Sequence, residues 1–508
     1  MEALRHCLPS SVRGILDELP ESLDETYERV LKSINKSSRD HAHRLLQCLT
    51  VAVRPLRVEE LAEVLAIDFD AARHEGIAKI KPDWRWADQH QAILSTCHSL
   101  VAIVGDGGSQ VVQFSHFSVK EFLTSDRLAR SSGEISRYHI PLSPAHTVFA
   151  QACLCVLLRL HEVVTWYDVI PLASYAARYW VVHAQFEDVS SHIRDAMECL
   201  FDVDKPHWEA WHCFYNIDDI SWSNFNFSNI DRVLDDIPWS NFNPDEVFSN
   251  PDRVLDDITW SDFNPDGVFS DVLPLYYAAL CGFYDLTKQF IAKNPEHVNA
   301  RGGRMMTPLV AALNRNHFLV ADLLHQHGAD VDARDQSQWT LLHEASFTGL
   351  VDVVEWLLDH GADVNARNVH GSLPLHMASE CGRLETCRVL LERNADINSR
   401  GRWGVVPLHF AAAPNHAEDM PEILRLLLDR GADANARDDD GCTPLHYSSW
   451  WEKESFQPCH GTIEGSRLLL DYGADINAKN NEGKTPLRLA EEAGRHEMVE
   501  FLSGLGAQ

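Results

Sequence analysis

The chain has 508 residues, with 44 basic and 75 acidic side chains and a net charge of −31. This length predicts two to four domains with cores of ordinary size, and the negative charge opposes nonspecific attachment to nucleic acid or to anionic membranes. The most apolar stretch, residues 148–158, is too short to span a bilayer.

The cysteines and the first residues of the chain indicate the compartment. The twelve cysteines are scattered without a framework spacing, which favours reduced thiols over disulfides or zinc ligands. Met1–His6 contains no apolar run, so a secretory signal is not expected. We therefore predict a cytoplasmic protein, with the nucleus as the alternative compartment, that does not enter a membrane.

The first part of the chain combines helical patterns with one β-hairpin. Apolar residues recur at helical spacing between Tyr27 and Ile34. Farther along, residues 100–104 and 110–115 are strand-like runs joined by the glycine-rich stretch 105–109, and a helix is expected from about Ser118. Helices followed by a hairpin and a further helix are typical of a winged-helix domain.

Three phrases in this region carry a resemblance to a known family: residues 19–31, 54–61 and 114–123. In this order they resemble the stretch that follows the nucleotide-binding core of fungal NACHT–ankyrin proteins. Those proteins are signal-transducing ATPases of the STAND class, related in plan to NOD-like receptors. The resemblance implies a regulatory winged helix over residues 1–135, continued by a helical region over residues 136–215.

The family places an ATP-binding core with a phosphate-binding loop before this segment, and the given sequence holds no such core before Leu8. The Gly-Lys-Thr at 483–485 is not such a loop, because Ala478 stands where the loop requires glycine. We therefore predict no enzymatic activity, no catalytic residue, no cofactor and no metal in this chain. A separate NACHT-type ATPase is an expected partner, and a fragment or subunit of such an ATPase stays as an alternative.

Two features of the winged-helix region have sharper alternatives. His116 stands between a strand and a helix, but no nucleophile is paired with it in the sequence, so we interpret it as a polar residue that orients the junction. Nucleic-acid binding would rest on scattered cations such as Lys79, Lys81 and Arg85, which are few for the phosphate contacts that DNA affinity needs. A nucleic-acid-binding regulator therefore stays as the second alternative.

Residues 216–272 contain a tandem duplication. The run Asp231–Asp236 and the aromatic run Trp239–Phe242 each recur 21 residues later, and residues 201–272 hold 16 acidic and 3 basic side chains. The aromatic residues oppose a plain disordered spacer, whereas the Asn, Asp, Ser and Pro content opposes a packed helix pair. We predict a semi-ordered acidic linker.

From residue 273 to the end, the sequence repeats with a period near 33 residues. Equivalent segments begin at Leu273, Thr307, Thr340, Leu373, Val406, Thr443 and Thr485, with steps of 34, 33, 33, 33, 37 and 42 residues. Such a period marks a solenoid, in which each unit buries its apolar face against its neighbours. About seven units are expected, with atypical units at the two ends.

One unit shows the local logic of the repeat. Thr340 is placed to cap a helix, Ala345 keeps that helix thin enough for close stacking, and Gly349 fits a left-handed C-cap. A second helix follows and ends at Gly361-Ala362-Asp363. These strings resemble the ankyrin repeat. The resemblance implies an α-solenoid, in which Arg488, replacing the motif histidine, suits a polar capping unit.

Solenoids of this kind present long surfaces to partners and seldom house active sites. The candidate partner-binding residues lie at turn tips and in one inserted loop: Gln336, Gln338, Trp339, His370, Arg402, Trp403, Asp439, Asp440, Trp450, Trp451, Asn481 and Glu482. Trp339 and Trp403 are the first choices because tryptophan is enriched at binding hot spots. The alternative is that each tryptophan packs on its neighbouring turn. The two insertions, 414–421 and 450–461, are expected to emerge side by side.

The sequence thus predicts a mainly α protein with a winged-helix-like domain that carries a small β-hairpin, a helical region, the acidic linker 216–272 and an ankyrin solenoid over residues 273–508. The predicted function is protein–protein recognition by the solenoid. The predicted role is that of a receptor-like sensor or adaptor of STAND type that lacks its ATPase core.

Overall fold

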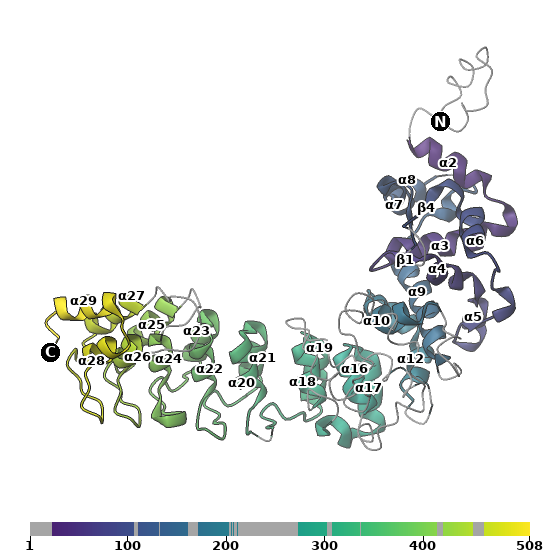
Figure 1. Ribbon diagram of the computed structural model, residues 1–508. Helices are drawn as coiled ribbons and strands as arrows, with labels where there is room; N and C mark the ends of the chain where they lie inside the picture. The colour runs from purple at the N-terminus through teal and green to yellow at the C-terminus, as the bar shows by residue number, and fades with distance from the viewer. Residues whose placement is uncertain are drawn as a thin grey trace, which may run out of the picture. The chain divides into compact units, whose positions relative to one another are not determined.

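The computed structural model describes residues 23–105, 110–131, 133–160, 171–202, 205, 207, 211, 273–301, 307–335, 337–413, 420–450 and 462–507. The chain divides into two compact units, Met1–Pro274 and Leu275–Gln508 (Figure 1). The predicted acidic linker, residues 216–272, lies outside the described residues, as do nearly all of the two insertions near 414–421 and 450–461.

The first unit contains the predicted winged helix. Its helices are α2 (Leu23–Ser33), α3 (Arg39–Val51), α4 (Val58–Glu63), α5 (Asp70–Glu75), α6 (Gln89–Cys97), α7 (Phe117–Thr124) and α8 (Asp126–Ala129). A three-stranded antiparallel sheet has the order β1-β5-β4, with β1 at Leu56–Arg57, β4 at Val101–Val104 and β5 at Val111–Phe114. A second small sheet pairs β2 (Ile67–Asp68) with β3 (Lys79–Ile80).

The hairpin and the helix after it follow the sequence pattern. In the β4–β5 pair, Val101 lies opposite Phe114 and Val104 lies opposite Val111, so the glycine-rich stretch connects the two strands as predicted. The next helix, α7, buries Val119, Phe122 and Leu123. These apolar side chains recur at helical spacing, and their burial fixes the helix against the domain core.

A helical region completes the first unit. It consists of α9 (Leu142–Leu157), α10 (Ala173–Ala184), α11 (Val189–His192) and α12 (Arg194–Leu200), and α9 packs against both α3 and α10. A buried hydrogen-bond chain joins these parts: the Val53 N–H donates to Tyr175 Oη (3.0 Å), Tyr175 Oη lies 2.9 Å from His183 Nε2, and His183 Nδ1 lies 2.9 Å from His146 Nδ1. Burial lowers the pKa of His183 to about 3, so its ring stays neutral within this chain.

The second unit is a stack of helix pairs, drawn from teal to yellow in Figure 1. The pairs are α16 (Pro274–Leu280) with α17 (Tyr284–Lys293), α18 (Pro308–Asn314) with α19 (Phe318–Gln326), α20 (Leu341–Thr348) with α21 (Val351–Asp359), α22 (Pro374–Glu380) with α23 (Leu384–Glu392), α24 (Pro407–Ala412) with α25 (Met420–Asp429), α26 (Pro444–Trp450) with α27 (Thr462–Asp471), and α28 (Pro486–Glu492) with α29 (His496–Gly504). A continuous apolar core, from Leu275 to Leu469, runs through the first six pairs, and Ala490, Met498 and Leu502 form a separate cluster in the last pair. The mainly α solenoid predicted from the 33-residue period is therefore confirmed.

Polar side chains also tie successive units together. Arg301, Arg334 and Arg367 each donate to the backbone carbonyl 33 residues ahead, at 2.7, 2.9 and 3.1 Å. Arg437 does the same across the longest step, to the Lys479 carbonyl at 2.8 Å. Guanidinium groups suit this role because they stay charged and offer several donors. We call this series the arginine ladder.

A second series runs along asparagine side chains. Asn299, Asn398 and Asn435 each donate through Nδ2 to a glycine carbonyl of the next unit, at 2.8, 3.4 and 2.9 Å. Each also accepts the backbone N–H of the aspartate two residues after that glycine, at 2.8, 3.0 and 2.8 Å. One amide side chain therefore satisfies a donor and an acceptor of its neighbour. We call this series the asparagine ladder.

Candidate protein-binding surface

The turn tips are held by a buried histidine in each regular unit. Nδ1 of His376 accepts the backbone N–H of Leu373 at 3.0 Å, and its Nε2 donates to the carbonyls of Ser399 and Val405 at 3.0 and 3.2 Å. The same pattern recurs at His343, His409 and His446. Burial lowers the pKa of each ring, to about 4 for His376. Each neutral ring therefore joins the start of one helix to the turn of the next unit.

In units that lack this histidine but keep the threonine three residues earlier, that threonine caps the helix through its hydroxyl group. The Thr307 and Thr485 hydroxyls accept the backbone N–H of Val310 and Arg488, at 3.4 and 3.3 Å. In the unit with His343, the Thr340 hydroxyl lies 2.9 Å from the ring Nδ1. Thr340 is the N-cap of α20, as the sequence predicts, and it shares that role with the histidine ring.

Each regular tip is shaped by an Asx turn. Asp335, Asn368, Asp438 and Asn480 each accept the backbone N–H groups two and four residues later through their side-chain oxygen. Neighbouring tips are also joined along the backbone. Val369 N–H donates to the Ser337 carbonyl at 3.1 Å, and Asp439 N–H donates to the Trp403 carbonyl at 2.9 Å. The tips therefore form a fixed row rather than separate loops.

The two tryptophans of the row differ in environment. Trp339 is half-buried, with its ring 5.7 Å from the His343 ring and 6.3 Å from the Phe347 ring. It occupies the register position of Ser372, which is buried at the inner end of the next tip. Trp403 lies at the outer end of its own tip and is 65% exposed. The structure does not bring the two rings together, because a complete tip separates them.

The other candidate residues lie along the same row. Gln338, His370, Arg402, Asp439, Asp440, Asn481 and Glu482 are exposed. Asp439 is partly engaged, because Arg400 Nη2 lies 2.8 Å from its Oδ1. Gln336 and Trp451 lie outside the described residues, and for Trp450 only the backbone, at the end of α26, is described.

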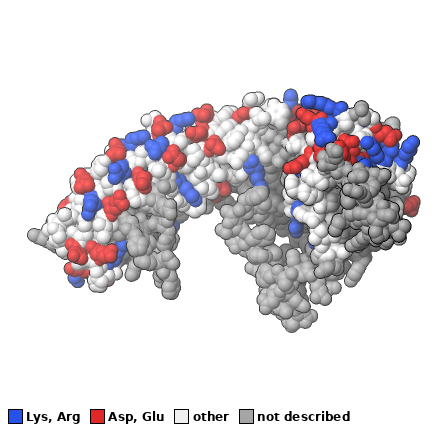
Figure 2. All heavy atoms as spheres, turned by 90° about the horizontal axis from the view of Figure 1, so that it is seen from above, with Lys and Arg blue, Asp and Glu red and all other residues white. Residues whose placement is uncertain are grey.

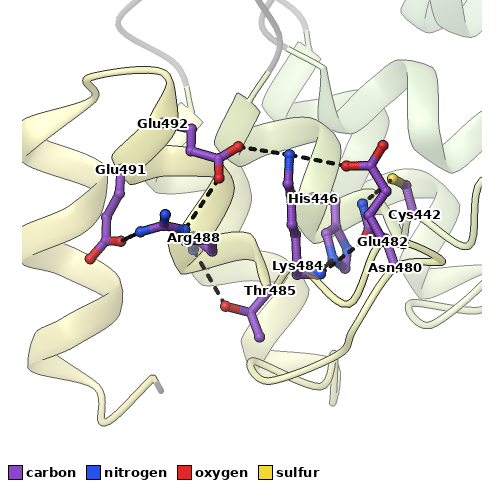
Figure 3. Close-up of polar contacts among 9 residues, drawn as sticks. All are labelled: Cys442, His446, Asn480, Glu482, Lys484, Thr485, Arg488, Glu491 and Glu492. Carbon is purple, nitrogen blue, oxygen red and sulfur yellow. Dashed lines mark hydrogen bonds and ion pairs between the residues drawn. The ribbon is translucent and has the colours of Figure 1, made fainter.

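The last unit ends the row with ion pairs (Figure 3). Lys484 Nζ lies between Glu482 (3.0 Å) and Glu492 (2.9 Å), and Arg488 contacts Glu491 (3.1 Å) and Glu492 (3.2 Å). Arg488 stands where the regular units carry the buried histidine, and its side chain turns to these carboxylates on α28. This charged surface suits a terminal unit that faces solvent.

Sequence reasoning missed one exposed apolar residue of the row. Val369 is 55% exposed at the tip beside His370. Its register position is that of Arg402 in the next tip, so aligning the units by their period would have revealed it. On the face drawn in Figure 2, basic and acidic side chains alternate along the stacked repeats.

The cations considered for nucleic-acid binding are engaged within the first unit. Arg85 forms a forked pair with Glu63, with Nε and Nη2 at 3.1 and 2.6 Å from Oε1, and the Glu63 side chain is 2% exposed. Lys81 lies 3.9 Å from Asp68. Pairing of this kind reduces the charge that these residues can offer to a phosphate backbone.

His116 has the local role expected for a junction residue. It is the N-cap of α7, and its Nδ1 accepts the backbone N–H of Ser118 at 3.2 Å. Among the described residues, no group of three or more His, Cys, Asp or Glu side chains is arranged to hold a metal ion. Within the same part of the chain, no helix is both long and apolar enough to cross a bilayer.

Comparison with known proteins supports both parts of the fold. A family model described as ankyrin repeats matches residues 275–368, 375–458 and 408–508, and one described as the winged helix domain of GPI inositol-deacylase matches residues 12–133. The azaphilone pigments biosynthesis cluster protein L of Monascus ruber is 30% identical over 332 residues, which cover 62% of this chain and 61% of that protein. The chain thus spans about three fifths of that relative's length.

Two shorter similarities concern a small part of the chain. Ankyrin repeat and SAM domain-containing protein 6 of Mus musculus is 32% identical over 83 residues, 16% of this chain and 9% of that protein. Alpha-latrocrustotoxin-Lt1a of Latrodectus tredecimguttatus is 41% identical over 61 residues, 12% of this chain and 4% of that protein. The chain therefore combines a winged-helix domain of the GPI inositol-deacylase type with ankyrin repeats, has a homologue in a fungal biosynthesis cluster, and carries repeats that support protein–protein interaction.

Proposed function

We propose that the chain recognises a partner protein through the row of ankyrin turn tips, as a receptor-like sensor or adaptor. The observation that carries this proposal is the combination of a fixed backbone with exposed side chains. Tips that are hydrogen-bonded to one another lose little conformational entropy on binding, and an exposed Trp403 offers the kind of side chain that dominates interface energies.

The test is affinity capture with the full chain from cells that express it. A Trp339→Ala/Trp403→Ala double variant should lose at least one partner that the wild-type chain retains. Trp84→Ala serves as the matched control, because Trp84 is a 45% exposed tryptophan of the first unit. Equal capture by the wild-type chain and the double variant would show that the tips do not carry the recognition.

We further propose that this recognition controls a separate NACHT-type ATPase, in the manner of a STAND switch. The support is the order of the winged helix, the helical region and the ankyrin units, together with the three phrases that resemble those of NACHT–ankyrin proteins. Cross-linking and mass spectrometry of the chain in its own cells should identify an ATPase of this class. Recovery of the tip-dependent partner without any ATPase would leave an adaptor role and remove the switch.

A further inference from the structure

The tip formed by residues 401–404 departs from the regular tips. Arg402–Gly404 is one turn of 3₁₀ helix, and Trp403 has a φ of 55°, a left-handed conformation that is unusual for a bulky residue. The Arg402 guanidinium carbon lies 3.9 Å from the centre of the Trp403 ring, within the range of a cation–π contact. We call these two side chains the Arg–Trp pair.

Gly401 explains why this tip is different. It replaces the Asx residue of the regular tips, and a Cβ at this position would lie 2.8 Å from Ser372 Oγ and 3.0 Å from His376 Nε2. The tip lacks the Asx turn but keeps the two backbone bonds that also close the regular tips, from Gly401 N–H to the Val405 carbonyl (2.8 Å) and from Gly404 N–H to the Gly401 carbonyl (3.1 Å). The surrounding bonds therefore hold Trp403 in its outward position.

Arg402 differs from the other arginines near the tips. Arg334, Arg367 and Arg437 donate to carbonyls of the next unit, and Arg400 pairs with Asp439. The Arg402 guanidinium makes no hydrogen bond or ion pair with the residues that the structure describes. A guanidinium that lies over an indole keeps its N–H groups in its own plane, where they can bind a carboxylate in a forked geometry.

The residues around the Arg–Trp pair favour a single carboxylate over a nucleic acid as its anionic ligand. Exposed Val369 and His370 lie on the preceding tip, whereas Asp439, Asp440 and Glu482 are exposed on the following tips. A nucleic acid carries charge along its whole length, and the three acidic side chains would repel it. A protein segment with a single carboxylate avoids this repulsion when the carboxylate lies at Arg402 and the rest of the segment extends over Val369, away from the acidic tips.

We propose that the Arg–Trp pair binds a protein segment in which a carboxylate stands beside a large apolar side chain. The carboxylate accepts from the in-plane N–H groups of Arg402, and the apolar side chain covers the exposed indole of Trp403 and Val369. This inference rests on the proposed function, namely that the tips bind a protein, and it specifies the chemistry of the bound segment.

The experiment is selection of short random peptides on the immobilised full chain, followed by affinity measurement on variants. Arg402→Gln removes the forked donor, and Arg402→Lys keeps the charge but loses the planar stack. Trp403→Gly removes the indole at a backbone position that glycine tolerates, so lost binding would not reflect unfolding. Arg388→Gln is the control, because Arg388 is a partly exposed arginine on α23 that pairs with Glu385.

Enriched peptides should carry Asp or Glu next to Trp, Phe, Leu or Met. Their affinity should fall about tenfold for Arg402→Gln and for Trp403→Gly, less for Arg402→Lys, and not at all for Arg388→Gln. Peptides without acidic residues, or equal binding by the variants, would overturn the proposal. If no peptide is enriched while capture of a cellular partner still depends on the tips, the segment proposal fails and the proposed function stands.

Discussion

At the scale of single residues, one position of each tip requires a left-handed backbone conformation. The position of Gln338 is glycine in the four other tips, at Gly371, Gly404, Gly441 and Gly483, all with φ between 71° and 78°. Gln338 adopts a φ of 58° at the same point of the turn. A left-handed conformation at a residue with a Cβ costs about 1 kcal/mol, so this tip carries backbone strain that the others avoid.

We expect Gln338→Gly to raise the free energy of unfolding by about 1 kcal/mol, because glycine adopts positive φ without a steric penalty. Urea unfolding followed by circular dichroism measures the change. The reverse substitution Gly371→Gln should lower stability by a similar amount, since a Cβ at Gly371 meets no atom closer than 3.8 Å. A loss of stability in Gln338→Gly would mean that the glutamine side chain, and not the backbone, decides the effect.

The difference between the two tryptophans also belongs to this scale. Residue type alone makes Trp339 and Trp403 equally good binding candidates, but their positions within the repeat differ. Trp339 aligns with buried Ser372 and Val405, and Trp403 aligns with exposed His370. Their environments could therefore be predicted from the period. The stacking of Arg402 on Trp403 could not, because it depends on a backbone conformation that Gly401 makes accessible.

At the scale of elements, the asparagine ladder has one altered rung. Asp332 takes the place of asparagine between the second and third units, and its carboxylate accepts the Asp363 N–H at 3.2 Å. A carboxylate cannot donate to the next glycine carbonyl as an amide does. Burial, together with the nearby charges of Asp363 and Asp330, raises the pKa of Asp332, so the charged form is disfavoured in the folded chain.

Asp332→Asn should therefore raise the free energy of unfolding at neutral pH by about 1 kcal/mol, through the added amide hydrogen bond and the removed charge. Because the folded pKa of Asp332 lies above its unfolded value of 3.8, the charge penalty disappears in the wild-type chain below that pH. The stability gap between the two chains should then narrow in acid. Asn299→Asp provides the reverse comparison, and a more stable Asn299→Asp chain would contradict the account.

The buried histidines predict a pH dependence of the solenoid. The pKa of His376 falls from 6.5 in the unfolded chain to about 4 in the folded chain. Between these values the unfolded chain binds more protons, so stability is present above pH 6.5 and is lost as pH falls toward 4. The physical reason is that a proton on Nδ1 would face the Leu373 N–H, which donates to it in the neutral ring.

Between pH 7.5 and pH 5, the wild-type chain should therefore lose about 2 kcal/mol more stability than His376→Asn. Chemical unfolding at the two pH values measures this difference. The control is His370→Asn, which removes an exposed histidine without touching a buried hydrogen-bond pair. Parallel pH slopes for wild-type and His376→Asn would exclude His376 as the source.

Much of the element order could be predicted from the sequence, because it depends on local signals. The 33-residue register and its prolines locate the helix starts at 308, 374, 407, 444 and 486, and the two strand-like runs locate the hairpin. The arginine ladder could not be predicted in the same way. Each arginine donates to a backbone carbonyl one unit away. Because every residue has such a carbonyl, the sequence does not identify the acceptor.

At the scale of the whole molecule, each unit has a core of its own. The main apolar core of the repeats runs from Leu275 to Leu469, and a smaller cluster contains Ala490, Met498 and Leu502; both lie within the second unit. The first unit buries its own set, which includes Leu45, Phe149 and Trp180. Separate cores are what allow domains to fold independently.

Two fragments, residues 1–211 and 273–508, should therefore each fold when expressed alone. Circular dichroism spectra of the fragments should add up to that of the full chain, less the contribution of residues 212–272, and each fragment should unfold cooperatively on heating. The full chain is the control. A fragment that stays unfolded would show that its core needs the other unit.

The arginine ladder has a consequence for how such a chain changes in evolution. Arg301, Arg334 and Arg367 each bond to the same point of the next unit, so gain or loss of one of these units would conserve the rungs on either side of it. The rung from Arg437 to Lys479 spans the 42-residue step, which shows that this lengthening between the helices leaves the rung intact. Genes for this protein can therefore vary in repeat number and in inserted loops while these bonds between units are kept.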